Sequence, residues 1–380
     1  MKKKAIAAGH ICLDITPAFP DRKAERVSDA LVPGQLLNVG PADVHTGGAV
    51  ANTGLAMKSF GADVSLMGKV GNDAFGRMVL SALRECGADQ GMICSETEAT
   101  SYSVVLAIPG IDRIFLHNPG ANDSFRADDI PLPALKEAAL LHFGYPPLMR
   151  SMYAQDGAEL VRLMRRANEA GAAASLDLAA VDADSAAGRV SWRRILERTL
   201  PYVDFFVPSA EELCFMLDPV RFAEWQARAA GRDITDVLEP QTDIAPLAEE
   251  CLRLGARVVL IKCGGPGMYF RSADRRTLER ISPRLSLDAS AWADRAWFEH
   301  SFVPERVLSG TGAGDASIAA FLTAVLEGRP PEQAVTLAAA AGACCVSAYD
   351  ALSGLIPFEA MEKKIASGWA RQGGEHTEGA

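Results

Sequence analysis

The sequence lacks several patterns that would assign a function at once. Its eight cysteines include no CxxC pair and no companion histidines at ligand spacing, which argues against a zinc or iron–sulfur site and favours buried thiols. No apolar run approaches the roughly 18 residues needed to cross a bilayer. The basic start, MKKK, precedes an apolar stretch too short for a signal peptide. We therefore expect a protein of the cytoplasm, without contact to a membrane.

An excess of positive charge is also missing. The formal net charge is −10 and the pI is near 5.2, which argues against a general nucleic-acid or anionic-membrane surface. The P-loop pattern GxxxxGK[ST] is absent, and the dinucleotide fingerprint fails because GTGAGD lacks its last glycine. Any phosphate site should therefore be small and built from backbone amides.

The chain has ample apolar sequence for a large core, with 380 residues of which 49% are hydrophobic. Buried strands alternate with helices through most of it, which predicts an α/β fold with a mostly parallel central sheet between helices. Two segments break this rhythm, and we expect them to form a small β-sheet lid. Residues 271–300 are rich in Arg and Asp, and we expect them to form a second peripheral excursion. The predicted division is a main domain of residues 1–15, 45–98 and 119–360, a lid of residues 16–44 and 99–118, and a C-terminal tail of residues 361–380.

Residues 309–328, SGTGAGDASIAAFLTAVLEG, combine a glycine turn with the start of an apolar helix. Gly310, Gly312 and Gly314 would let an anion approach the unpaired N–H groups at the helix start. Asp315 follows directly. Its carboxylate fits two interpretations, an ordinary helix cap or a base that takes a proton from an attacking hydroxyl.

A second glycine turn lies within residues 45–76. Gly47 and Gly48 precede a predicted helix over residues 49–60, in which Asn52 comes one turn from the start. A double glycine before a helix is compatible with close packing alone or with a ligand nearby. Asp14 follows a predicted buried strand over residues 5–13, so we expect it at the carboxyl end of that strand, where α/β sheets hold their ligands; a simple turn residue is the alternative.

These two stretches, GGAVANTGLAMKSFGADVSLMGKVGNDAFG and SGTGAGDASIAAFLTAVLEG, resemble the two signature regions of the ribokinase (PfkB) family of sugar and nucleoside kinases. They occur in the family's order, with IKCGGPG between them. The resemblance implies a ribokinase-like fold with a β-sheet lid. It also implies ATP and Mg²⁺ as cofactors.

Site residues follow from the resemblance position by position. Asp315 corresponds to the catalytic base, and the amides of Gly312, Ala313 and Gly314 to the anion hole. The implied contacts to sugar hydroxyls come from Asp14, Gly47, Gly48 and Asn52. The loop under the nucleotide corresponds to Cys263, Gly264 and Gly267, and the magnesium-linked acid to Glu212, for which a solvated acid at a helix start is the alternative.

Tyr102 and His117 on the predicted lid hairpin are further candidates for substrate contact, although an isolated histidine is more often structural.

Two departures from the family pattern matter. Ser309 and Gly310 replace Asp-Thr, which leaves activation by a monovalent cation such as K⁺ open, and Ser209 replaces the Asn of an NxxE motif.

We expect ATP-dependent transfer of phosphate to a primary hydroxyl of a sugar or sugar derivative. A nucleoside kinase is the nearer alternative, with Tyr102, Phe115 or the Trp-containing segment 292–297 contacting a base. The second alternative is a catalytically silent sugar sensor on the same fold. A homodimer through the lid is compatible with the family, but no residue in the sequence decides it.

Overall fold

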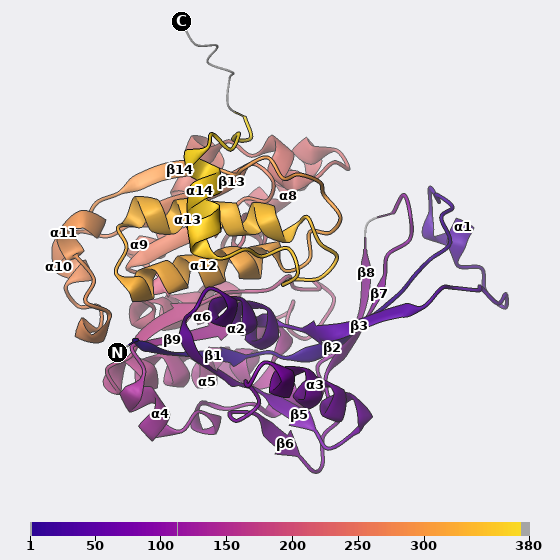
Figure 1. The fold of residues 1–380 in the computed structure, drawn as a ribbon, viewed down its shortest axis with the longest axis horizontal. Helices are drawn as coiled ribbons and strands as arrows, with labels where there is room; N and C mark the ends of the chain where they lie inside the picture. The colour runs from indigo at the N-terminus through magenta and orange to yellow at the C-terminus, as the bar shows by residue number, and fades with distance from the viewer. Residues whose placement is uncertain (1, 112, 374–380) are drawn as a thin grey trace, which may run out of the picture.

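The computed structural model describes residues 2–111 and 113–373 (Figure 1). Its main sheet has eight strands in the order β14-β13-β12-β11-β10-β9-β1-β4, parallel from β12 through β4, with β13 and β14 added antiparallel. The expected mostly parallel sheet is thereby confirmed. The strands are β1 (Lys4–Gly9), β4 (Asp63–Met67), β9 (Leu140–Gly144), β10 (Ala173–Leu176), β11 (Phe205–Phe206), β12 (Val258–Lys262), β13 (Gly267–Ser272) and β14 (Ala296–His300).

Successive residues of each strand point to opposite sides of the sheet, so apolar side chains project from both faces. Helices cover both faces and bury these side chains. Val258 and Leu260 belong to one apolar cluster, whereas Val259 and Ile261 belong to the other. The first face carries α2 (Ala49–Ser59), α3 (Ala74–Glu85), α12 (Ala313–Glu327), α13 (Pro331–Cys345) and α14 (Phe358–Ala366). The second carries α4 (Leu132–Glu137), α5 (Arg150–Glu169), α6 (Trp192–Thr199), α7 (Ala210–Leu217), α8 (Pro219–Ala229) and α9 (Ala245–Arg253).

A separate four-stranded sheet stands out from the body on the right of Figure 1 and forms the lid. It contains β2 (Cys12–Pro17), β3 (Ala42–Gly47), β7 (Tyr102–Leu106) and β8 (Ile114–Asn118) in the order β3-β2-β7-β8, and α1 (Val27–Ala30) lies at its tip. The predicted lid sheet is confirmed, although its strands begin and end a few residues away from the predicted boundaries. A small third sheet joins β5 (Lys69–Gly71) to β6 (Ile93–Ser95).

The first predicted strand, residues 5–13, is in fact two strands in two sheets. The chain leaves the main sheet at Gly9, whose φ of 123° and close approach to the carbonyl of Gly144 exclude a side chain. His10 N–H donates to Gly144 O (3.2 Å), and Val50 N–H donates to His10 O (3.1 Å). Asp14 therefore lies within lid strand β2, and the expectation that it ends a strand of the main sheet was wrong.

Residues 271–300 were expected to form a peripheral excursion, but they extend the main sheet through β13 and β14. The short helices α10 (Arg275–Leu278) and α11 (Ala289–Trp292) connect these two strands. Trp292 is only 1% exposed and packs edge-on against Phe205, Phe270 and Phe321. It therefore belongs to the core and cannot stack on a nucleobase, which corrects that part of the nucleoside alternative.

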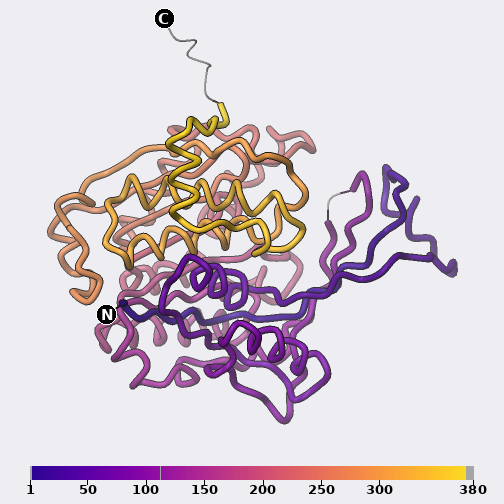
Figure 2. The backbone as a smooth tube through the Cα atoms, viewed as in Figure 1, coloured from indigo at the N-terminus to yellow at the C-terminus, as the bar shows by residue number. Residues whose placement is uncertain are grey.

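The expected boundary of the C-terminal tail at residue 361 falls inside α14. Phe358 of this helix stacks on Phe60 with ring centroids 4.9 Å apart, and Met361 is buried. Beyond it, Trp369 stacks on Phe302 (4.6 Å). Figure 2 shows this segment, in yellow, beside α13. The remainder of the predicted tail, residues 374–380, lies outside the described residues.

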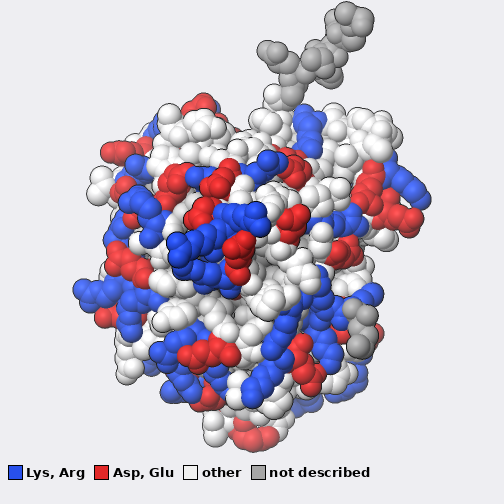
Figure 3. All heavy atoms as spheres, turned by 90° about the vertical axis from the view of Figure 1, so that its left-hand side faces the viewer, with Lys and Arg blue, Asp and Glu red and all other residues white. Residues whose placement is uncertain are grey.

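Short 3₁₀ and π turns complete the structure: η1 (Gly120–Ser124), η2 (Ala127–Asp129), η3 (Pro146–Leu148), η4 (Leu200–Tyr202), η5 (Ile234–Val237), η6 (Pro240–Ile244) and η7 (Pro283–Leu285). The face seen in Figure 3 carries basic and acidic side chains interspersed with one another. Within residues 2–111 and 113–373, no helix combines the length and apolar character that a membrane crossing requires.

Candidate active site

A cavity of about 480 Å³ lies between the lid and the start of α12, and several polar side chains line it. It brings together six of the residues predicted from the sequence, from four separate parts of the chain: Asp14, Gly48, Asn52, His117, Gly312 and Asp315. Gly47 borders the cavity indirectly, since a side chain there would collide with the Asp14 carboxylate. The sequence signals thus converge on one site.

Asp315 lies in the first turn of α12, is 4% exposed and accepts hydrogen bonds from three side chains. Thr53 Oγ1 donates to its Oδ1 at 2.8 Å, while Asn52 Nδ2 and Tyr145 OH donate to its Oδ2 at 3.2 and 2.7 Å. The N-cap position of α12 is Gly312. The Asp315 carboxylate is therefore held by side-chain donors and does not act as a plain helix cap.

Tyr145 was not found from the sequence, yet it reaches Asp315 from the loop after β9. Its backbone is left-handed (φ 66°, ψ 42°), a conformation that costs a non-glycine residue about 1–3 kcal/mol and recurs at functional sites. Burial raises the pKa of the Tyr145 hydroxyl well above its usual value, and Asp315 reinforces this. The phenol thus stays protonated and donates to the carboxylate.

The glycine turn before α12 is held by its own hydrogen bonds. Thr311 N–H donates to Ser309 Oγ (3.1 Å), and Ala313 N–H donates to Gly310 O (3.3 Å). Gly312 has φ 76°, and a side chain there would collide with Ala351. Of the three predicted anion-hole amides, that of Ala313 is therefore engaged within the turn in this conformation.

A buried ion pair lies beneath this turn. Lys262 Nζ donates to Asp177 Oδ1 at 2.7 Å, and a β-carbon on Gly314 would lie 3.5 Å from Lys262 Cδ and Cε. Burial, against the opposing effect of Lys262 and together with the charges of Glu212 and Asp315, raises the pKa of Asp177 to about 7. Sequence reasoning missed Lys262, although a lysine ending the apolar run VVLIK before a glycine loop is a signal that could have found it.

Glu212 forms a capping box at the start of α7. Ser209 N–H donates to Glu212 Oε2 (3.1 Å), and Glu212 N–H donates to Ser209 Oγ (3.4 Å). In the described part of the chain, no three His, Cys, Asp or Glu side chains are grouped as ligands of a metal ion. Mg²⁺ usually binds one or two carboxylates together with water and substrate phosphates, so Glu212 and Asp177 fit that ion.

The predicted nucleotide loop follows β12, outside the cavity that contains Asp315. Cys263 N–H donates to Gly267 O (2.8 Å), which closes the loop. Gly264 has φ 62° and packs against Thr235, and no heavy atom lies within 4 Å of a β-carbon placed on Gly265. Burial raises the pKa of the Cys263 thiol to about 12, so it remains a neutral packing residue.

His10 is a cavity residue that the sequence analysis did not identify. It is 2% exposed, its Nδ1 has no hydrogen-bond partner among the described residues, and its ring centroid lies 5.1 Å from that of His117. Burial lowers the pKa of His10 well below its usual value. A β-carbon on Gly48 would approach His10 Nδ1 to 2.6 Å, so close packing explains that glycine.

The lid contributes a cation as well as the predicted residues. Arg113 Nη2 donates to Ser309 Oγ at 3.0 Å, and its Nη1 donates to Thr311 Oγ1. The lid thereby contacts the glycine turn directly.

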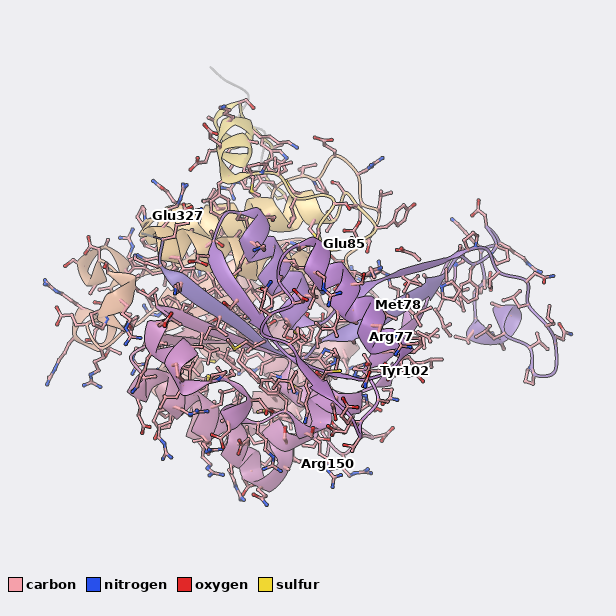
Figure 4. The ribbon with its side chains drawn as sticks, turned by 60° about the horizontal axis from the view of Figure 1, so that its bottom comes forward. Arg77, Met78, Glu85, Tyr102, Arg150 and Glu327 are labelled. Carbon is pink, nitrogen blue, oxygen red and sulfur yellow. The ribbon has the colours of Figure 1, made fainter. Side chains whose placement is uncertain are left out.

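Tyr102, a predicted substrate contact, does not line the cavity that contains Asp315. It lines a neighbouring cavity and packs edge-on against Phe75, with ring centroids 5.4 Å apart. Figure 4 places it at the junction of the lid and α3.

A buried carboxylate at a helix start and a cavity between the body and the lid sheet are features typical of a small-molecule site on an α/β fold. A sequence model of the pfkB family of carbohydrate kinases matches residues 11–357. The chain belongs to this family. An uncharacterized sugar kinase from Archaeoglobus fulgidus is 23% identical over 301 residues, covering 79% of this chain and 98% of that protein.

Solved structures agree on the fold. Arabidopsis thaliana ribokinase complexed with ribose and ATP superposes with a TM-score of 0.69 at 20% identity, covering 96% of this chain and 98% of the other. Fructokinase with bound ATP from Xylella fastidiosa gives a TM-score of 0.70 at 21% identity, covering 97% and 99%. The ribokinase-like fold predicted from the sequence is confirmed.

Proposed function

We propose that this protein transfers the terminal phosphoryl group of ATP to a primary hydroxyl of a sugar or sugar derivative. The observation that carries this proposal is the Asp315 carboxylate, held by Thr53, Asn52 and Tyr145 in a polar cavity beside the start of α12. The family supports a carbohydrate kinase. The ATP in the ribokinase and fructokinase structures supports the donor.

Asp315 acts as the general base. As the substrate oxygen forms its bond to phosphorus, the hydroxyl proton moves to Asp315, and the bond from phosphorus to the leaving oxygen of ADP breaks. A positioned base contributes about 100-fold to 10,000-fold to such a step. Thr53, Asn52 and Tyr145 fix the carboxylate, so little reorganisation is required when the proton is transferred.

Charge that develops on the transferred group is stabilised from the glycine turn. N–H groups at the start of α12 face the anion, with Gly312 and Gly314 as the principal donors and Ala313 joining when its contact to Gly310 opens. Lys262 adds a positive charge beneath Gly314. These groups act mainly by position and charge, as phosphoryl transfer requires.

Substrate hydroxyls bind on the opposite side of the cavity. Asp14 accepts hydrogen bonds, Asn52 donates and accepts them, and the unpartnered ring nitrogens of His10 and His117 add two further contacts. Gly47 and Gly48 allow Asp14 and His10 to pack close beside them, where both side chains line the cavity.

Cofactor contacts lie beyond the carboxyl ends of β10, β11 and β12. Glu212 and Asp177 would hold Mg²⁺ through water, and the ion would neutralise charge on the ATP phosphates. Cys263, Gly264 and Gly267 shape the loop beneath the nucleotide. A homodimer formed through the lid stays a prediction.

The proposal is tested by incubating the purified chain with ATP, Mg²⁺ and a panel of sugars and nucleosides, and identifying the products by mass spectrometry. We expect a monophosphate of one sugar-containing compound and equimolar ADP. Product formed from nucleosides alone would favour the alternative function, which the exposed Phe115 in the lid supports. Saturable sugar binding without product would identify a silent sensor. Replacing K⁺ by Na⁺ in the same assay tests the monovalent cation.

A further inference from the structure

Three neighbouring strands of the main sheet, β10, β11 and β12, lead into charged side chains. Asp177 directly follows β10, Glu212 lies in the first turn of the helix after β11, and Lys262 is the last residue of β12. Lys262 N–H donates to Pro208 O (2.9 Å), and Ser209 forms an isolated parallel bridge to Lys262. Because the carboxyl ends of parallel strands meet at one edge of a sheet, the lysine is placed beside both acids.

The Lys262 ammonium lies directly under the glycine turn. Its Nζ donates to Asp177 Oδ1 at 2.7 Å, and a β-carbon on Gly314 would lie 3.5 Å from Lys262 Cε and 3.8 Å from Nζ. An ammonium group has three N–H donors, and in residues 2–111 and 113–373 Asp177 is the only hydrogen-bond acceptor of this one. A phosphate bound at the start of α12 would therefore lie near a lysine with two unused donors.

The opposite end of β12 carries a second buried ion pair, which is held more completely. Arg257 Nη1 donates to Asp204 Oδ1 at 2.6 Å, and Asp204 Oδ2 accepts the N–H of Ala174 at 2.7 Å. Within the described part of the chain, the Asp177 carboxylate accepts a hydrogen bond from Lys262 alone. The burial of the two pairs is nearly equal, with side chains 13% and 2% exposed for Arg257 and Asp204, and 13% and 3% for Lys262 and Asp177. The pair under the glycine turn thus depends on a single contact.

We propose that Asp177 neutralises Lys262 in the absence of nucleotide and that Lys262 changes partner during the reaction, from the Asp177 carboxylate to the phosphoryl group that ATP transfers. One ammonium–carboxylate contact breaks, one ammonium–phosphate contact forms, and no proton is transferred. The flexible four-carbon stem of a lysine suits this movement, and an ammonium binds phosphate as well as carboxylate. The carboxylate that is released is one of the two that fit Mg²⁺. This inference rests on the proposed function and deepens it.

The test measures nucleotide binding by calorimetry at pH 8 in EDTA, without sugar, so that no phosphate is transferred. Asp177→Asn removes the competing partner of Lys262. ATP should bind this variant about 10-fold to 100-fold more tightly than it binds the wild type, which is the effect of one hydrogen bond to a charged group. The affinity for AMP should stay unchanged, because AMP has no phosphate at the position of transfer.

The double variant Lys262→Met/Asp177→Asn separates the release of the lysine from a simple loss of repulsion. Removing a carboxylate reduces the repulsion of ATP phosphates whether or not a lysine is present. We expect the double variant to bind ATP about 10-fold to 100-fold more weakly than Asp177→Asn does, and AMP equally well. Equal ATP affinities of the two variants would overturn the proposal. The double variant leaves no buried charge unpaired, and its thermal midpoint reports the fold.

Asp204→Asn is the matched control, because it breaks an equally buried ion pair on the same strand, away from the glycine turn. It should bind ATP as the wild type does, and a gain equal to that of Asp177→Asn would overturn the proposal. A crystal structure of the wild type with a nonhydrolysable ATP analogue tests the change of partner without a substitution. We expect Lys262 Nζ within about 3 Å of a terminal phosphate oxygen, and an Nζ still bound to Asp177 would overturn the proposal.

These measurements separate the inference from the proposed function, because they require neither a sugar nor turnover. If no compound is phosphorylated but ATP binding differs between the variants as expected, the change of partner stands and the kinase proposal fails. If a sugar is phosphorylated and the two variants bind ATP equally, the kinase proposal stands and the change of partner fails.

Discussion

The two walls of the active-site cavity differ in how firmly their side chains are held. On the body wall, Asp315 is almost fully buried and accepts three side-chain hydrogen bonds. On the lid wall, Phe115 is more than half exposed. The side chain at the centre of the body wall is fixed by hydrogen bonds, whereas the lid presents surface that a substrate would cover. We therefore expect substitutions in the body to change turnover and substitutions in the lid to change substrate preference.

The largest effect is expected at the centre of the body wall. Asp315→Asn keeps the size of the side chain and an oxygen for Thr53 or Tyr145 but removes the base. Turnover should fall by about 100-fold to 10,000-fold. Steady-state kinetics measure the loss, and an unchanged thermal midpoint shows that the fold is intact. A variant that turns over at the wild-type rate would remove Asp315 from its proposed role.

Tyr145→Phe should have the next largest effect, because it removes one donor to the same carboxylate. Hydrogen bonds to charged groups contribute about 1.5–3 kcal/mol, which corresponds to a loss of roughly 10-fold to 100-fold in kcat. KM should change little, since the phenol is proposed to hold the base. Tyr349→Phe, at an exposed tyrosine, is the control. A rise in KM at constant kcat would instead make Tyr145 a binding residue.

The ion pair beneath the glycine turn predicts a pH dependence of stability. Since burial raises the pKa of Asp177 to about 7, the folded chain retains this proton to a higher pH than the unfolded chain does. The contribution of Asp177 to stability is thus greatest below pH 4 and declines as the pH rises to 7. The free energy of unfolding of the wild type, relative to Asp177→Asn, should fall by about 2 kcal/mol between pH 5 and pH 8.

Urea denaturation at the two pH values measures this difference. Asp63→Asn, at an exposed aspartate on the edge strand β4, is the control and should run parallel to the wild type. A constant difference between the wild type and Asp177→Asn would mean that Asp177 is ionised throughout the range.

The smallest stability effect is expected on the lid wall. Phe115→Ala removes an exposed ring, so the free energy of unfolding should stay within about 0.5 kcal/mol of the wild type. For a substrate that the wild type phosphorylates, KM should nevertheless rise several-fold while kcat is retained. Parallel kinetics and denaturation measure both. A loss of kcat as large as that of Tyr145→Phe would abolish the distinction between the two walls.

Much of the site could be predicted because its residues belong to local patterns. The glycines and Asp315 stand together at one helix start, Gly48 and Asn52 at another, and the hairpin of β7 and β8 interrupts a regular strand–helix alternation. Such signals need only neighbouring residues, so a single sequence contains them. The family resemblance then related the two helix starts to each other.

The residues that were missed are defined by pairings distant in sequence. Tyr145 meets Asp315 because α12 packs against α2, which contacts β9. Arg113 meets the glycine turn because the lid reaches over it. Nothing near Tyr145 in the sequence indicates that its backbone is left-handed. Residues 271–300 were misplaced because β14 is an edge strand, whose partly exposed and charged sequence resembles a surface loop.

The crossing between the two sheets at His10 also limits how the lid can move. Hydrogen bonds from the main domain hold His10 on both sides, and Asn122 holds both the N–H and the carbonyl of Ile11. This crossing is therefore a rigid attachment of the lid to the main domain and not a hinge. We expect the base of the lid, with Asp14 and Ser103, to stay rigid, and bending to be confined to the outer part beyond Pro17. A sugar would then meet its full set of hydrogen bonds on arrival, and closure would serve mainly to exclude water.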